Sequence, residues 1–390
     1  MRESSICREL RPPRVRGLAR AAALCAALWV MVLFAAAVAR GQNAAGDNWN
    51  PVVGPSAGAK YVGEKVCATC HVQEAESYSK TPMARAGALP AETSILHKYP
   101  RLTFQSGPYH YLISTQAGKS IYSVTDGKKA ISEPILWAFG MPLSGQTYML
   151  WHDGAYYQSR VSYFTDVNGL GITLGIPLTP PRTLEEAFGD RQEESIGRLC
   201  ISCHTTGAKV GGVFRPQNSV PGVSCESCHG PGAQHVAAIQ QGKPAPASAS
   251  IFNPAKLAPY ELDDFCGSCH RTWSQVIEMQ VMDVRNVRFQ PYRLQISACW
   301  SASDPRISCL ACHDPHQTLV RTTAFYDAKC LACHQEKGRP KLADHPGSAC
   351  PVSTHDCITC HMPRYELPGG HIKFFDHDIR VARAGAPYPH

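Results

Sequence analysis

The stretch GVSCESCHGPGAQH, residues 222 to 235, places two cysteines three positions apart and a histidine directly after the second cysteine. Another histidine follows six residues after the first one. One such Cys-x-x-Cys-His motif is compatible with a zinc site, a redox-active dithiol or covalent attachment of haem. A single copy therefore does not decide between these three kinds of site.

The number of copies distinguishes between these kinds of site. The 390 residues include 18 cysteines and 17 histidines, and the motif occurs seven times. A random arrangement of the same residues would give roughly 0.04 copies. The copies are CATCH (67–71), CISCH (200–204), CESCH (225–229), CGSCH (266–270), CLACH (309–313), CLACH (330–334) and CITCH (357–361).

Covalent haem attachment explains the spacing within each copy. Cysteines at i and i+3 lie on one side of a helical turn, where their thiols can add to the two vinyl groups of one haem, and the histidine at i+4 reaches the iron. Zinc fits poorly, because an odd number of units that each end in histidine does not close tetrahedral sites. Disulfide scaffolding fits less well still, since the motif uses fourteen of the 18 cysteines.

We therefore predict seven covalently bound c-type haems with their iron. The predicted attachment residues are Cys67, Cys70, Cys200, Cys203, Cys225, Cys228, Cys266, Cys269, Cys309, Cys312, Cys330, Cys333, Cys357 and Cys360. The predicted proximal iron ligands are His71, His204, His229, His270, His313, His334 and His361.

The N-terminus predicts export, which covalent haem attachment requires. Six arginines precede an apolar run at residues 21–39 that ends in the small-residue cleavage site AVA. We interpret residues 1–39 as a signal peptide and 40–60 as a flexible linker. An uncleaved anchor is the alternative, because the apolar run is just long enough to span a bilayer. The expected location is periplasmic or otherwise extracytoplasmic, with membrane contact only if the segment stays uncleaved.

The charge balance gives no support to a nucleic-acid partner. The formal net charge is +7, but six basic residues fall in the predicted signal peptide. The remainder carries 32 basic and 29 acidic residues, and haem propionates would add further negative charge. No basic surface of the kind that binds nucleic acid follows from these numbers.

The attachment motifs are distributed unevenly, which predicts the fold class. Six of them lie between Cys200 and His361, so too little chain is available to surround each porphyrin with an apolar core. We expect a mainly α multihaem cytochrome c fold with little regular structure, organised around packed haems. The 30 prolines and 31 glycines agree with much loop.

The segment between the first and second motifs has another pattern. Polar and apolar residues alternate from about 100 to 165, with turns at AGK, DGK and HDG, which predicts an inserted β-meander. A helical pattern then leads into Cys200. We divide the rest of the chain into a first haem-attachment segment (61–99), a β-rich segment plus connecting helix (100–199) and a six-haem domain (200–390).

Ten histidines outside the motifs are candidates for the second axial ligands. Proline turns after two motifs let the following histidine swing toward a neighbouring haem, and a histidine just before a motif points away from its own haem. The predicted distal ligands are His235, His316, His355 and His377, followed by His345 and His97, and then by His110 and His371. Met83 is either a thioether ligand or a buried apolar residue. A disulfide between Cys299 and Cys350 is open.

Several of these stretches together resemble the cytochrome c-554-like multihaem c-type cytochromes. The resemblance rests on YVGEKVCATCH, GVSCESCHGPGAQH, RISCLACHDPH, CITCHMP and FFDHDIR, and it covers nearly all of residues 61–380. ILWAFGMPLSGQTYMLWHDG is similar to the β-rich segment of that family. The resemblance implies His235, His316 and His377 as distal ligands, whereas many relatives have histidine where this chain has Met83.

The predicted function is electron transfer through seven haems, with no catalytic residue. The expected partners are redox proteins: a quinol-oxidising donor and a periplasmic or outer-membrane acceptor. The alternative is a multihaem reductase of the nitrite or hydroxylamine class, in which one five-coordinate haem binds substrate. Such nitrite reductases commonly use a Cys-x-x-Cys-Lys site, and this sequence has none. A haem-bearing subunit of a larger conduit is a third hypothesis.

Overall fold

The computed structural model describes residues 60–141, 144–210, 213–214, 216–302, 304, 306–334, 350–382 and 387–389. All of them belong to one compact unit, Trp49–His390. The predicted signal peptide and all but the last residue of the predicted linker lie outside the described residues. Among the helices that are described, none has the length and apolar character needed to cross a membrane.

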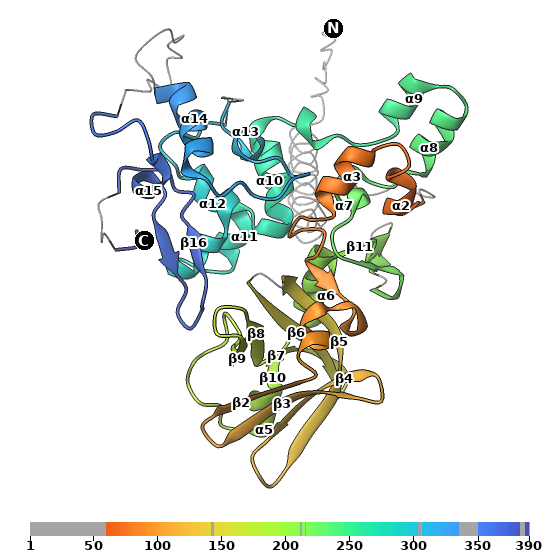
Figure 1. Cartoon of the computed structure of the whole chain (residues 1–390), viewed down its shortest axis with the longest axis vertical. Coiled ribbons are helices and arrows are strands. Elements are labelled where there is room, and N and C mark those ends of the chain that lie inside the picture. The colour runs from red at the N-terminus through yellow and green to blue at the C-terminus, as the bar shows by residue number, and fades with distance from the viewer. Residues whose placement is uncertain are drawn as a thin grey trace, which may run out of the picture. The chain divides into compact units, whose positions relative to one another are not determined.

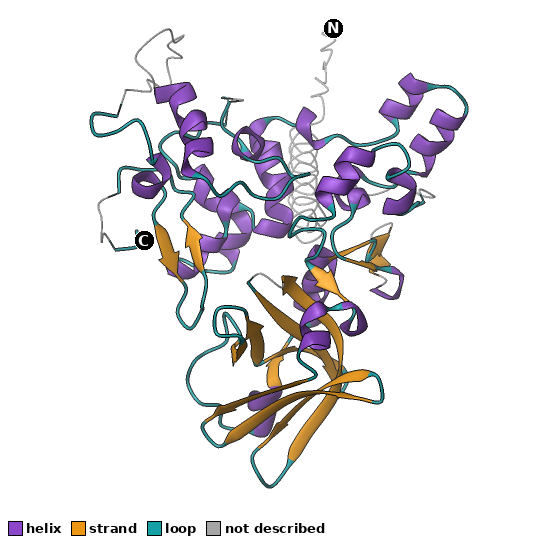
Figure 2. Ribbon diagram, viewed as in Figure 1, coloured by secondary structure: helices purple, strands orange, loops and turns teal. Residues whose placement is uncertain are grey.

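Ten strands form one antiparallel sheet in the N-terminal half of the described chain (Figures 1 and 2). The strands are β1 (Gly87–Ala88), β2 (Arg101–Ser106), β3 (Tyr109–Gln116), β4 (Lys119–Thr125), β5 (Ala130–Met141), β6 (Gly145–His152), β7 (Ala155–Ser159), β8 (Val161–Phe164), β9 (Gly169–Ile172) and β10 (Gly189–Arg191). Their order is β10-β7-β6-β5-β4-β3-β2, with β1 on β5 and β8 between β6 and β9. Because β2 also contacts β9, the sheet is strongly curled.

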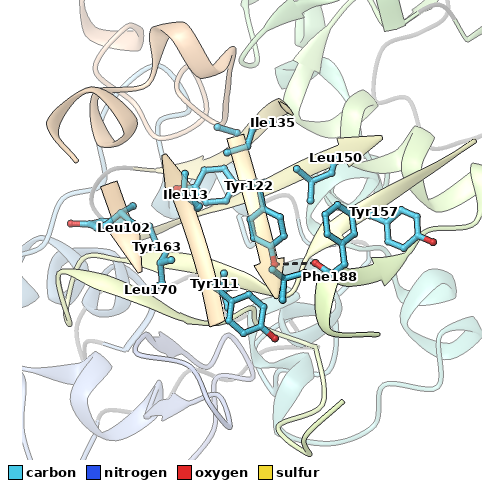
Figure 3. Packing of buried hydrophobic residues seen from close by; sticks show 14 of the residues in the cluster. Leu102, Tyr111, Ile113, Tyr122, Ile135, Leu150, Tyr157, Tyr163, Leu170 and Phe188 are labelled. Carbon is cyan, nitrogen blue, oxygen red and sulfur yellow. Dashed lines mark hydrogen bonds between the residues drawn. The ribbon is translucent and has the colours of Figure 1, made fainter. Parts of the chain in front are cut away.

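The sheet has its own apolar core. Strands β3 and β4 alternate buried and more exposed residues, as expected for a sheet with one buried face. Tyr122 is fully buried, packs edge-on against Phe188 with ring centroids 5.4 Å apart, and donates its hydroxyl hydrogen to the Phe188 carbonyl at 2.9 Å (Figure 3). Phe188 ends the short helix α5 (Leu184–Phe188), which closes this core.

Short helices dominate the rest of the described chain (Figure 2). The α-helices are α2 (Glu64–Cys67), α3 (Val72–Tyr78), α4 (Ser94–Lys98), α6 (Glu194–His204), α7 (Cys225–His229), α8 (Ala233–Gln240), α9 (Pro244–Ala249), α10 (Pro259–His270), α11 (Trp273–Glu278), α12 (Gln290–Gln295), α13 (Cys309–Cys312), α14 (Thr323–His334) and α15 (Cys357–His361). The 3-10 helices are η1 (Pro90–Glu92), η2 (Pro216–Asn218), η3 (Pro254–Lys256) and η4 (Val284–Arg288). Two-stranded sheets pair β11 (Thr205–Thr206) with β14 (Val220–Pro221), β12 (Lys209–Val210) with β13 (Val213–Phe214), and β15 (Arg364–Glu366) with β16 (Lys373–Phe375).

These helices bury few of their own side chains. Helices α2, α3, α8 and α13 have no buried residue. A helix in a globular protein normally gains its stability by burying an apolar face. These four helices therefore do not bury a continuous apolar face against the rest of the described chain.

The expectation of a mainly α chain with little regular structure is wrong. A ten-stranded curled sheet stands beside the helices. The expectation failed because it applied the shortage of chain per haem to the whole protein. The sheet needs no porphyrin, since tyrosine, phenylalanine and branched aliphatic residues fill its interior.

Truncating Phe188 tests whether the sheet has an independent core. Phe188→Ala should lower the free energy of unfolding by about 3 to 5 kcal/mol, because it leaves a cavity and removes the packing of Tyr122. Urea unfolding of the purified holoprotein, followed by far-UV circular dichroism, measures the change. Val167→Ala is the control, since Val167 is 47% exposed, and it should change the free energy by less than about 0.5 kcal/mol. Equal midpoints for both variants would contradict this view of the core.

Candidate haem-binding site

Each of the seven motifs begins on a short helix. Helices α6, α10 and α14 end at the histidine of their motif, α7 and α15 span one motif each, and α13 holds both cysteines of the fifth. In the first motif the chain turns at the end of α2, where the His71 N–H donates to the Cys67 carbonyl at 3.0 Å. The helical turn therefore presents both thiols and the histidine of a motif together.

No disulfide joins any of the motif cysteines that the structure describes. Cys299 and Cys350 are not joined either, so the described residues do not contain the disulfide that the sequence left open. Cys299 instead lies near Cys312, Cys330 and Cys333, and burial raises the pKa of its thiol to about 11.

Six of the seven motifs line one continuous cavity of about 2330 Å³. The seventh motif contributes Ile358 to the same wall. His235, His316, His377 and Met83 also line it. The cavity lies between the short helices, where side chains do not fill the space.

Three pairs of histidine rings face each other in this region. The ring centroids are 6.3 Å apart for His71 and His235, 6.0 Å for His229 and His316, and 6.3 Å for His313 and His377. Two imidazoles on opposite sides of one metal ion have centroids roughly 6 Å apart, because each bond is about 2 Å long and each centroid lies about 1 Å beyond its nitrogen. The spacing of all three pairs fits one iron atom between the rings.

Each pair joins a motif histidine to a histidine from another part of the chain. His235 lies on α8, just after the third motif, and faces the first motif. His316 follows the fifth motif and faces His229 of the third. His377 comes from the C-terminal segment and faces the fifth motif. Three of the predicted distal ligands are thus brought opposite a motif histidine.

Backbone carbonyls orient several of these rings through Nδ1. The Nδ1-to-oxygen distances are 2.8 Å for His204 with Ala86, 2.8 Å for His229 with Phe252, 3.0 Å for His235 with Ala247, 2.9 Å for His361 with Arg380, and 3.1 Å for His377 with Phe375. A carbonyl accepts a hydrogen bond, so Nδ1 carries the proton and Nε2 keeps a free lone pair. This is the arrangement in which proteins present histidine to a metal.

Burial also favours the ligating form of the rings. Desolvation lowers the pKa of His204, His229, His270 and His313, and it lowers the pKa of His377 to about 4. A lowered pKa means that the imidazole is neutral at neutral pH, and only the neutral ring can bind a metal.

Other predicted ligands lie in different surroundings. His355 is 79% exposed, and its Nδ1 lies 3.1 Å from an oxygen of Asp356. His97 is exposed on α4, next to the large sheet, while His345 lies outside the described residues. In the described part of the chain, no second histidine ring contacts His204, His270 or His361.

Thiols of different motifs lie close together. Neighbouring pairs are Cys67 with Cys225, Cys203 with Cys269, Cys266 with Cys309, and Cys330 with Cys357. Cys228 is also near Cys266, and Cys312 is near Cys330. The attachment points therefore form a connected series rather than seven separate sites.

The sequence did not indicate the charged side chains that hold the segment carrying His377. Arg293 is buried and donates to both carboxylate oxygens of Asp376, at 2.8 and 2.9 Å, and to Asp378 at 3.1 Å. His377 lies between these two aspartates, and its carbonyl accepts the Ser297 hydroxyl hydrogen. The two carboxylates thus anchor the segment that carries His377 to helix α12.

Hydrogen bonds to aspartates connect the fourth motif with the fifth and the sixth motif with the seventh. Asp263 accepts hydrogen bonds from Trp300 at 2.7 Å and from the Cys309 thiol at 3.2 Å. Asp327 accepts the backbone N–H groups of Asp356 and Cys357, both at 2.8 Å. Both aspartates stand three positions before the first cysteine of a motif, and this recurring spacing is the sequence signal that could have identified them.

Comparisons with known proteins agree with this site. The family model described as "Cytochrome c554 and c-prime" matches residues 182–230. The multiheme cytochrome MtrA of Shewanella baltica (strain OS185) is 26% identical over 201 residues, which cover 42% of this chain and 60% of that protein. The chain therefore matches less than two thirds of that relative's length.

A solved structure has a more distant likeness. The crystal structure of the outer cell wall cytochrome OcwA is 17% identical in sequence, with a TM-score of 0.36 over 81% of this chain and 70% of that one.

Replacing the facing histidines tests the three ring pairs. His235→Leu, His316→Leu and His377→Leu should each convert one low-spin haem into a high-spin haem, because the iron loses one strong nitrogen ligand. Electron paramagnetic resonance of the oxidised protein measures the change. His152→Leu is the control, since His152 lies in the large sheet with Nδ1 2.8 Å from Glu133. An unchanged spectrum in any of the three variants would refute that pair.

Removing the buried arginine tests the anchoring of His377. Arg293→Met should give the same high-spin signal as His377→Leu, in part of the molecules, because Asp376 and Asp378 lose the arginine that joins them to α12 and keep only Arg380, which lies on their own segment. Arg285→Met is the control, since the Arg285–Asp283 ion pair is half exposed. A fully low-spin Arg293→Met protein would show that His377 is held by other contacts.

Proposed function

We propose that this chain, a multihaem c-type cytochrome by family, binds seven haems and transfers electrons along them outside the cytoplasm. The three histidine pairs with centroids 6.0 to 6.3 Å apart carry this proposal. Their spacing suits an iron with two nitrogen ligands, and an iron with two protein ligands exchanges electrons rather than substrates. The seven motifs, of which six line one cavity, support the haem number.

The residues of each motif have separate tasks in this function. The two cysteines would attach the cofactor and the histidine would bind iron through Nε2, while in the second, third and seventh motifs a backbone carbonyl holds Nδ1. The haem, when bound, supplies reversible one-electron chemistry at its iron. The polypeptide fixes the order of the cofactors and excludes water from between them.

The neighbouring thiols support an order for electron transfer. Cysteines in hydrogen-bonding distance link the first motif to the third, the fourth to the fifth and the sixth to the seventh. Cysteines near enough to interact electrostatically link the third motif to the fourth and the fifth to the sixth. The second motif joins this series at the fourth, through Cys203 and Cys269. We infer a linear path with one side branch, in which the order in space differs from the order in sequence.

The proposed location is the periplasm or another extracytoplasmic space. Covalent haem attachment takes place outside the bacterial cytoplasm, and the sequence of residues 1–39 has the pattern of an export signal. The proposed partners are redox proteins, with a quinol-oxidising module as the donor and a periplasmic or outer-membrane protein as the acceptor.

Haem count and spin state test this function together. Intact-mass spectrometry of the protein, produced with a working haem-attachment system, should show seven haem additions. The double variant Cys357→Ser with Cys360→Ser should show six, since it removes one attachment site at the end of the path. A colourless protein, or one with the mass of its amino acids alone, would refute the proposal. A dominant high-spin spectrum that changes with cyanide would favour the reductase alternative instead.

A further inference from the structure

Glu226 is a buried acidic residue inside the third motif, CESCH. Its side chain lies on α7 between the two attachment cysteines, and the residue is only 2% exposed. Buried carboxylates are costly unless hydrogen bonds or cations compensate them. In the described part of the chain no cation forms an ion pair with Glu226, so its compensation must come from hydrogen bonds.

Three backbone N–H groups supply that compensation. Oε1 accepts from Val62 at 2.9 Å and from Gly232 at 2.8 Å, and Oε2 accepts from Gly63 at 2.8 Å. Hydrogen bonds to a carboxylate are about twice as strong as those between neutral groups. One side chain thus binds two backbone segments that are 169 positions apart, because Gly63 and Gly232 donate to the same carboxylate.

Each of these segments leads directly to one member of a histidine pair. Gly63 precedes α2, which ends at Cys67, and His71 follows in the same turn. Gly232 precedes α8, which carries His235. The Ala233 N–H also donates to the Lys60 carbonyl at 3.2 Å, so the two segments touch directly as well. The space is tight, since a Cβ at Gly232 would lie 3.1 Å from Val62.

We propose that Glu226 is a positioning residue that holds His235 opposite His71 and lowers the midpoint potential of the haem between them. This inference rests on the proposed function, in which those two histidines bind one iron. The ferric form carries one more positive charge than the ferrous form. A fixed negative charge in a site that excludes water therefore stabilises the ferric form. This stabilisation lowers the midpoint potential of that haem.

Gly63 connects Glu226 to the attachment site of this haem. The Gly63 N–H donates to Glu226 Oε2 at 2.8 Å, and the Gly63 carbonyl oxygen lies 3.6 Å from Sγ of Cys67. The carboxylate therefore lies next to the first motif although it belongs to the third.

The test replaces the carboxylate by its neutral isostere in the full-length holoprotein. In Glu226→Gln the amide NH₂ faces a backbone N–H that previously had an acceptor, and the negative charge is gone. Glu64→Gln is the matched control, because Glu64 lies on α2 with its side chain exposed and its replacement removes the same charge. Spectroelectrochemical titration measures the potentials, and electron paramagnetic resonance measures the ligand geometry of each low-spin haem.

We expect Glu226→Gln to retain seven haems, to shift one midpoint potential to a more positive value, and to change the low-spin signal of the same haem. The His235→Leu variant identifies which signal and which potential belong to that haem. Glu64→Gln should shift this potential less. Wild-type potentials and signals in Glu226→Gln, or an equal shift in Glu64→Gln, would overturn the role of Glu226.

A second variant, Glu226→Asp, tests the role of Glu226 if Glu226→Gln does not acquire all of its haems. Glu226→Asp keeps the charge but shortens the side chain, so the low-spin signal should change while the potential shifts less. An unchanged signal in Glu226→Asp would then overturn the proposal. Failure of the proposed function gives a different result, because an unchanged spectrum in His235→Leu would refute ligation by His235 whatever Glu226 does.

Discussion

The three pairs of histidine rings that face each other 6.0 to 6.3 Å apart are the feature on which the proposed function depends most. An iron bound between two such rings would fix their distance through its bond lengths, yet the rings come from segments far apart in the chain, as with His71 and His235. A helical turn guarantees the relation of two cysteines and one histidine within a motif, but nothing local guarantees the opposite ligand. Much of the polar architecture around the cavity serves to hold those second segments in place.

Buried charges provide this support because apolar packing is scarce. Helices that bury none of their own side chains cannot define their positions by a hydrophobic face. A carboxylate that binds backbone N–H groups fixes both distance and direction, as Glu226 and Asp327 do. Such groups contribute little net stability, since burial of a charge offsets most of the gain. Their value lies in specifying one arrangement of segments.

The sequence predicted what is local and missed what is not. The motif spacing predicted the attachment residues, and the proline turns predicted His235 and His316 as distal ligands, which the fold places opposite motif histidines. The alternation of residues likewise predicted strands in the segment after residue 100. By contrast, Glu226 looks like an ordinary charged residue in the sequence, because its partners are segments that only the fold brings near. The extent of the sheet was underestimated, because the buried tyrosines that form its core come from several strands.

The large sheet also contacts the site, through strands β1 and β5. Strand β1 pairs with β5, and the Ala86 carbonyl just before β1 holds Nδ1 of His204 at 2.8 Å. Phe139 on β5 packs against the same imidazole, with ring centroids 4.9 Å apart. Gly87 must be a glycine here, because a Cβ would lie 2.3 Å from the His204 carbonyl oxygen. A carbonyl and an aromatic ring from the large sheet therefore hold His204 of the second motif, whereas carboxylates connect the fourth motif to the fifth and the sixth to the seventh.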